Sequence, residues 1–268
     1  MSATAPDSHL HSSGSFAEAT KLLAPMTAVV VCGGIGTRMG PVMKSAKCKS
    51  LLPVLGWPCL AYVLEALKRI NCSQCILSID RQDIYDEVDC IGKTSDLAYL
   101  MHMDSGRGPT VVAQEASRLI SSARFLVLYG HQIIFPDHLN QMIAADVDFV
   151  ATIYANSSEG TRKVATLDTE HYCVKLRRGG PESPAAGSEV YLDKPYILQT
   201  EVIRNTVPLD SCFHPDTPAD AYLRPQTILR YAHSLYTIPA TFRHEFHYAS
   251  ELEEVALLAR TFRQDYHG

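Results

Sequence analysis

The sequence lacks both a long apolar run and an excess of positive charge. No uninterrupted apolar stretch approaches the ~18 residues that a membrane-spanning helix needs, so the sequence excludes a spanning protein. The 268 residues carry 24 Lys and Arg against 29 Asp and Glu, which gives a net charge of −5. A protein that coats nucleic acid is normally basic as a whole. Neither a membrane nor a nucleic acid is therefore expected as a partner.

The eight cysteines lack the spacing of a disulfide framework or of a zinc site. Only Cys72 and Cys75 form a CxxC pair, and neither a second pair nor a nearby histidine completes a ligand set. We interpret this spacing as chance. Residues 1–23 lack the basic start and apolar core of a signal peptide, so we predict a disordered leader and a cytoplasmic protein.

Short apolar strands alternate with helical patterns in the first part of the chain. Residues 27–32 form a β-branched apolar run that ends at glycines, and residues 59–70 follow with helical spacing. Further strands are predicted at 75–80, 125–129 and 149–154, and further helices at 109–120 and 136–145. This alternation predicts a Rossmann-like, doubly wound α/β fold with a mostly parallel sheet.

The second part of the chain no longer alternates in this way and is rich in predicted strands and loops. We predict paired strands at 163–168 and 172–176, a strand at 190–199, a helix within 219–231 and a closing helix at 250–262. Ser250 is the expected N-cap of that last helix. One domain over residues 24–268 is predicted, with a Rossmann-like half at 24–155 and an appended β-rich half at 156–268.

A glycine-rich loop follows the first predicted strand, in the string Gly33-Gly34-Ile35-Gly36-Thr37-Arg38. Glycines let the backbone turn tightly and bring its N–H groups close to an anion. Residues 19–64 contain no Asp or Glu but five basic residues, namely Lys21, Arg38, Lys44, Lys47 and Lys49. The pattern predicts a phosphate site. The alternative is a plain turn beside a solvated basic face.

Two common phosphate-binding loops do not fit this string. The P-loop pattern GxxxxGK[ST] does not occur. A dinucleotide loop needs GxGxxG and an acidic residue about 20 positions later. Here Gly34 and Gly36 are followed by Gly40, one position late, and the first acid is Glu65. Hydride-transfer chemistry is therefore disfavoured.

Together with the segment Lys49-Ser50-Leu51-Leu52-Pro53-Val54-Leu55-Gly56, the loop resembles the sugar-phosphate nucleotidyltransferase family. That family opens with the pattern GGxGTRLxPLT…PKPLLPVxGxP. The resemblance is specific over residues 27–66 and weaker but continuous to the C-terminus. It implies transfer of a nucleoside monophosphate from an NTP to a sugar or sugar-like 1-phosphate, with release of pyrophosphate. A homo-oligomer is compatible with it.

The resemblance also implies roles for single residues. Arg38 binds the leaving β/γ-phosphates, and Lys49 contacts phosphate near the attacked centre. The nucleotide-binding residues that it implies are Gly33, Gly34, Gly36, Thr37 and Gly108. For Gly108, a turn next to the nucleobase and a plain loop are equal alternatives.

The chain departs from the family pattern where that family holds Mg²⁺ with aspartates. His131 stands at the first of these positions, and His247, or its neighbour Tyr248, at the second. Neutral imidazole is a poor ligand for Mg²⁺ and a good one for Zn, Co, Ni or Fe. The histidines could hold a softer divalent metal, or contact phosphate as imidazolium ions. In the third alternative, metal-dependent chemistry is lost, and a degenerate member binds nucleotide sugar and regulates or scaffolds a partner enzyme.

A further departure concerns the lysine of the family's EKP motif, which contacts the sugar phosphate. By spacing, this position falls on Arg177 or Arg178. Lys194, in Asp193-Lys194-Pro195, has the better local match but lies where the next strand should begin. We prefer the arginines over Lys194, and a solvated basic turn is the alternative for both.

Overall fold

The computed structural model describes residues 26–34, 36–106, 108–154, 163–178, 189–205, 235–241, 244 and 246–266. The predicted leader at 1–23 and the predicted helix within 219–231 lie outside the described residues. The described part of the chain contains no helix with the length and apolar character needed to cross a membrane.

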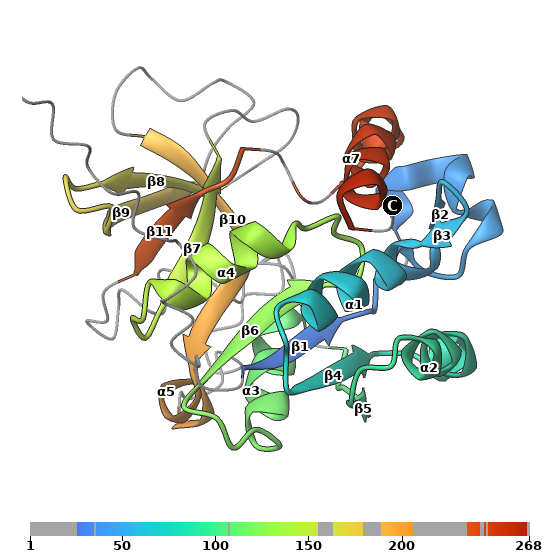
Figure 1. The fold of residues 1–268 in the computed structure, drawn as a ribbon, viewed down its shortest axis with the longest axis horizontal. Coiled ribbons are helices and arrows are strands. Elements are labelled where there is room, and N and C mark those ends of the chain that lie inside the picture. The colour runs from blue at the N-terminus through green and yellow to red at the C-terminus, as the bar shows by residue number, and fades with distance from the viewer. Residues whose placement is uncertain are drawn as a thin grey trace, which may run out of the picture.

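The centre of the molecule is a mixed sheet, to which nine strands of the described residues belong (Figure 1). The strands are β1 (Thr27–Val31), β4 (Gln74–Ile79), β5 (Tyr99–Met103), β6 (Arg124–Tyr129), β7 (Val150–Tyr154), β8 (Lys163–Leu167), β9 (Cys173–Arg178), β10 (Glu189–Gln199) and β11 (Tyr236–Pro239). Their order is β11-β7-β10-β6-β1-β4-β5, with β8 pairing to β10 and β9 to β8. A short hairpin of β2 (Pro53–Val54) and β3 (Trp57–Pro58) lies apart from it.

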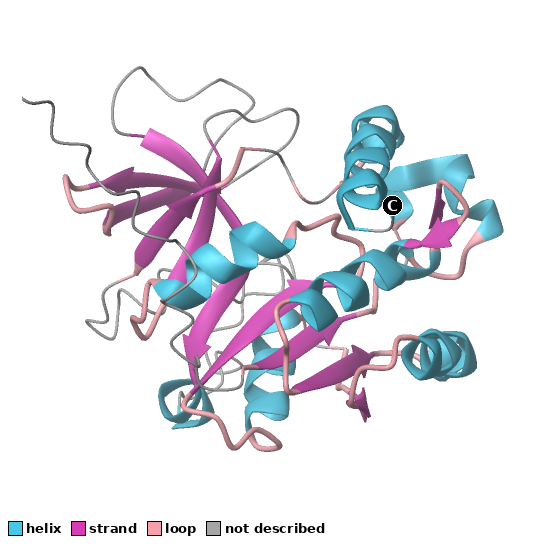
Figure 2. Cartoon of the chain, viewed as in Figure 1, coloured by secondary structure: helices cyan, strands magenta, loops and turns pink. Residues whose placement is uncertain are grey.

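Helices cover both faces of this sheet (Figure 2). They are α1 (Cys59–Arg69), α2 (Tyr85–Thr94), α3 (Pro109–Ser117), α4 (Pro136–Ala144), α5 (Thr200–Asn205) and α7 (Leu252–Tyr266). Side chains of α1, α2, α4 and α7 belong to one hydrophobic cluster, and those of α3 and α5 to a second. The sheet is parallel from β6 through β1 and β4 to β5. The predicted fold class is confirmed.

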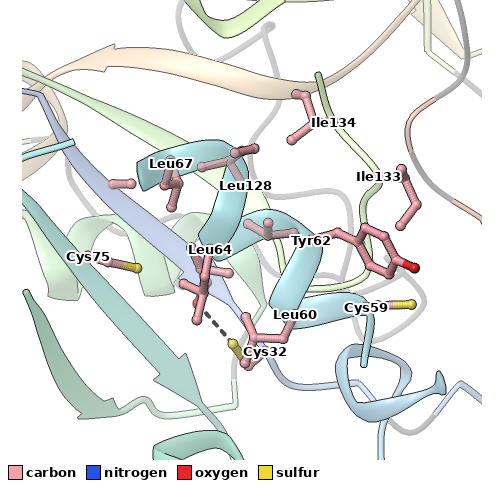
Figure 3. Packing of buried hydrophobic residues seen from close by; sticks show 14 of the residues in the cluster. Cys32, Cys59, Leu60, Tyr62, Leu64, Leu67, Cys75, Leu128, Ile133 and Ile134 are labelled. Atoms are coloured by element: carbon pink, nitrogen blue, oxygen red, sulfur yellow. Dashed lines mark hydrogen bonds between the residues drawn. The ribbon is translucent and has the colours of Figure 1, made fainter. Parts of the chain in front are cut away.

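Strand β1 is buried along its whole length because both of its faces are covered. Alternate residues point to opposite faces of a strand, so Ala28 and Val30 join one cluster while Val29 and Val31 join the other. Leu60, Leu64 and Leu67 recur at helical spacing on α1, in the same cluster as Leu128 of β6 (Figure 3). Burying each such leucine contributes about 1.5–3 kcal/mol. The strand and helix that flank the glycine loop are thereby fixed.

The structure contains elements that the sequence did not predict, among them α5, β11 and the β2–β3 hairpin. Helix α2 and strand β5 were not expected, and together they form the edge unit beside β4. Strand β10, from the predicted appended half, enters the main sheet between β6 and β7 and runs antiparallel to both. The two predicted halves therefore share one sheet. The predicted strand pair in the second half is confirmed, since β8 and β9 pair antiparallel.

Candidate active site

The candidate site lies at the carboxyl ends of two adjacent parallel strands, β1 and β6. Their last residues, Val31 and Tyr129, are register partners, so the loops that follow them leave the sheet at the same edge, where α/β sheets usually bind ligands. Gly130 meets a third segment there, because a Cβ on it would lie 2.5 Å from Oγ of Ser50. Ser50 Oγ donates to the carbonyl of Cys32 at 3.0 Å. These contacts bring the residue before Ser50, Lys49, to the end of β6.

The glycine loop makes room for the Lys49 side chain. Gly36 has φ 71° and ψ 35°, in the left-handed region that favours glycine. A Cβ at Gly36 would lie 2.9 Å from Cγ of Lys49. The amide of Lys49 also lies 3.4 Å from the carbonyl oxygen of Gly34, to which it donates. The loop therefore packs on both the backbone and the side chain of Lys49.

The ammonium of Lys49 is the meeting point of three segments. Its Nζ lies 3.3 Å from Nε2 of His131 and 3.2 Å from Nδ1 of His247. It also donates to the carbonyl oxygen of Phe246 at 3.0 Å. Lys49 and His131 are only 8% and 5% exposed. The structure thus brings together three residues that the sequence singled out at positions 49, 131 and 247.

The segment that carries His247 is held by Glu251, a buried carboxylate near the start of α7. Its Oε2 accepts the backbone N–H groups of His247 at 2.5 Å and Tyr248 at 3.0 Å. The expectation that Ser250 caps the last helix is wrong, because Ser250 lies inside the 3-10 turn η6 (Ala249–Glu251), whose N-cap is Tyr248. In addition, Ile133, just after β6, donates its N–H to the carbonyl of His244 at 2.8 Å.

Arg38 lies at the exposed rim of this cluster. It belongs to the 3-10 helix η1 (Thr37–Ser45), and its guanidinium carbon is 5.7 Å from the ring centroid of Tyr248. Thr37, the first residue of η1, is exposed next to it. Not all basic residues of this region gather here, however. Lys47 pairs with Glu87 on α2, at 2.6 Å, and so does not join the cations beside the glycine loop.

Lys194 lies close to the same cluster on strand β10. It is 3% exposed, and its Nζ donates to the hydroxyl of Tyr129 at 2.5 Å. The Tyr129 ring in turn stacks on His131 with the centroids 5.0 Å apart. The backbones of Arg177 and Arg178 belong to β9, but their side chains lie outside the described residues. Lys194 is therefore the predicted sugar-phosphate residue that the structure connects to His131.

Sequence reasoning missed Asp80, which directly follows β4. A Cβ on Gly33 would lie 2.6 Å from Oδ1 of Asp80, and a Cβ on Gly106 would lie 3.8 Å from its Cβ. Burial, and then the nearby Asp104 carboxylate, raise the pKa of Asp80. Gly108, the N-cap of α3, lies two residues beyond Gly106. The signal for Asp80 was its place at the carboxyl end of a parallel strand next to β1.

These residues do not fit Mg²⁺, which prefers oxygen ligands in octahedral geometry. Two of the three groups around the cluster's centre are imidazole nitrogens, and all three face the Lys49 ammonium. Across the described ranges, no three His, Cys, Asp or Glu side chains gather closely enough to hold a metal ion.

Comparison with known protein families gives a match over most of the chain. Residues 28–207 match the family described as the MobA-like NTP transferase domain. The chain belongs to this family. The predicted resemblance is thereby confirmed as far as nucleotidyltransferases in general, while the finer sugar-phosphate signature stays a prediction.

Individual relatives are more distant. The bifunctional protein GlmU of Methanococcus aeolicus is 26% identical over 160 residues, which cover 59% of this chain and 37% of that protein. The chain thus spans well under half of that relative's length. The inositol-1-phosphate CTP transferase of T. maritima has a TM-score of 0.73 at 14% identity, over 90% of this chain and 97% of its own. A putative glucose-1-phosphate thymidylyltransferase of Bacillus anthracis has a TM-score of 0.68 at 15% identity, over 88% and 95%. At these identities the two structures show a shared fold.

Proposed function

We propose that this protein transfers a nucleoside monophosphate from an NTP to a sugar or sugar-like 1-phosphate and releases pyrophosphate. The observation that carries the proposal is the placement of Arg38 and Lys49 beside the glycine loop at the ends of β1 and β6. Membership of an NTP transferase family supports the donor. Two proteins of the same fold, the inositol-1-phosphate CTP transferase and the putative glucose-1-phosphate thymidylyltransferase, support the class of acceptor.

The reaction requires that several negative charges be brought together. An oxygen of the acceptor phosphate attacks the α-phosphorus of the NTP, and the bond from this phosphorus to the bridging oxygen of pyrophosphate breaks. Lys49 supplies a point charge next to the attacked phosphorus, and Arg38 holds the leaving β/γ-phosphates with its planar fork of N–H donors. Gly33, Gly34 and Gly36, with Thr37, surround the triphosphate. Cations that are already in place stabilise the developing charge without rearrangement.

The acceptor enters from the side of β10. Lys194 is the described cation there, and it lies over the ring of Tyr129, with its Nζ 3.9 Å from the ring centroid. Arg177 and Arg178 remain proposed contacts of the same phosphate. Gly108 is the proposed neighbour of the nucleobase. It lies two residues beyond Gly106, which is close to Asp80, as Gly33 is.

A screen for pyrophosphate release tests the proposal. The protein is incubated with each common NTP and a panel of sugar and cyclitol 1-phosphates, with Mg²⁺, Mn²⁺, Co²⁺, Zn²⁺ or EDTA. We expect release in at least one combination, a drop of about 100-fold or more in Lys49→Met and Arg38→Ala, and near wild-type release in Lys47→Met. Lys47 is the matched control because its ammonium pairs with Glu87 at the surface. Thermal stabilisation by nucleotides without pyrophosphate in any combination would instead establish a degenerate, nucleotide-binding member.

A further inference from the structure

We propose that the ammonium of Lys49, clamped between two imidazoles, takes the place of a site-bound divalent cation in this protein. The inference rests on the proposed function only for the role of this cation, which is to stabilise the negative charge of the reactants' phosphates. Which cation occupies the space between His131 and His247 can be tested whether or not the protein turns over a substrate.

The described contacts of the clamp suit the donors of an ammonium. A lysine ammonium has three N–H donors, and the three contacts at 3.0, 3.2 and 3.3 Å go to one carbonyl and two imidazole nitrogens. Because the ammonium donates, the accepting nitrogens carry lone pairs, so the ring protons lie on Nδ1 of His131 and Nε2 of His247. All three acceptors are neutral in this arrangement. They orient the positive charge of Lys49 without cancelling it.

The surroundings hold this arrangement in place. His131 lies two residues after the end of β6, and its ring contacts those of Tyr129 and Phe246, with centroid distances of 5.0 and 5.7 Å. The backbone of His247 is bonded to the buried Glu251. Gly36 leaves the space that the Lys49 chain fills. The ammonium is thus positioned before any ligand binds, as electrostatic catalysis requires.

The same donor set explains why a divalent cation does not share this space with Lys49. A metal ion would need the lone pairs of His131 Nε2 and His247 Nδ1, which the ammonium now uses. It would also bring two positive charges beside a third in a buried place, where charges interact more strongly than in water. Transfer of the nucleotidyl group itself needs no proton and no electron from the clamp.

Cobalt binding without nucleotide tests the inference. Imidazole nitrogens bind Co²⁺ well, and its visible absorption reports the bound ion. If Lys49 occupies the clamp, Lys49→Met frees both imidazoles and binds Co²⁺ more than about tenfold tighter than wild type. Lys47→Met, which removes the surface lysine two positions earlier, should bind like wild type. Wild type that binds Co²⁺ as tightly as Lys49→Met would overturn the inference.

A second measurement on the wild-type protein covers the case in which Lys49→Met does not fold. ¹⁵N chemical shifts of the histidine rings at neutral pH should show His131 protonated only at Nδ1 and His247 only at Nε2. The opposite tautomers, or two imidazolium ions, would contradict the clamp. If no pyrophosphate is released under any condition, the proposed function fails, while the cobalt and ¹⁵N results still decide which cation occupies the clamp.

Discussion

His138 makes the stability of this protein sensitive to acid. It lies on α4 and is 8% exposed, with its Nε2 2.9 Å from Oγ1 of Thr152 and its ring 4.9 Å from that of His244. Thr152 in turn donates to the carbonyl of Pro195, next to Lys194. Burial lowers the pKa of His138 from 6.5 to about 4. Protonation of His138 would therefore disturb the packing around Thr152, which lies next to the strand that carries Lys194.

The sign of the effect follows from which state binds the proton. Below pH 6.5 the unfolded chain protonates His138 while the folded chain keeps it neutral, until the pH reaches about 4. The contribution of His138 to the free energy of unfolding is therefore complete above pH 6.5. It falls as the pH is lowered towards 4 and changes no further below about pH 4. The gap between the two pKa values corresponds to about 3 kcal/mol at about 1.4 kcal/mol per unit.

Urea unfolding of wild type and His138→Gln between pH 7.5 and 4.5 measures this contribution. Carboxylates that titrate in both proteins cancel in the difference between them. We expect wild type to lose about 2–3 kcal/mol more than the variant over this range. His171→Gln, at an exposed turn, should lose as much as wild type. Equal losses in wild type and His138→Gln would refute the reasoning.

Three further predictions concern Gly36, Glu251 and Asp80. Gly36→Ala and Gly56→Ala both place a side chain at positive φ and should each cost about 1–2 kcal/mol of unfolding free energy. Only Gly36→Ala should also lower pyrophosphate release, because a Cβ at position 56 meets no atom within 4 Å; equal release by both variants would contradict the packing argument. Glu251→Ala should cost about 1–3 kcal/mol and lower the turnover number, whereas Glu254→Ala, an exposed control on α7, should do neither. Asp80→Asn should raise the melting temperature at pH 7, because the folded state disfavours the charged carboxylate; this gain should vanish as the pH falls towards 3.8, and a lower melting temperature at pH 7 would be the opposite result.

The sequence predicted those parts of the fold that have strong local signals. Strand β1 is a run of β-branched residues that ends at glycines, and α1 repeats its leucines at helical spacing. By contrast, β5 is half-exposed and reads YLMHM, without β-branched residues. Helix α2 buries only Val88 and Gly92. A pattern method finds little to detect in either element.

The candidate site was only partly predictable for a related reason. Lys49 and His131 stand at fixed distances from recognisable strings, whereas the carbonyl of Phe246 carries no signal in a sequence. A count of charges along the chain also cannot show that Lys47 pairs with a helix 40 residues later, at Glu87. Spacing in the sequence favoured the arginines over Lys194. It could not show that β10 inserts beside β6 and so places Lys194 next to Tyr129.

The attachment of His247 to Glu251 has a consequence for biosynthesis. The sheet strands that flank the glycine loop are complete once residue 129 has been synthesised, yet the groups that orient Lys49 come from position 247 and its neighbours. A nascent chain can therefore acquire its central strands while Lys49 still lacks two of its three acceptors. The cluster around Lys49 is therefore completed only when the segment at the start of the last helix has docked.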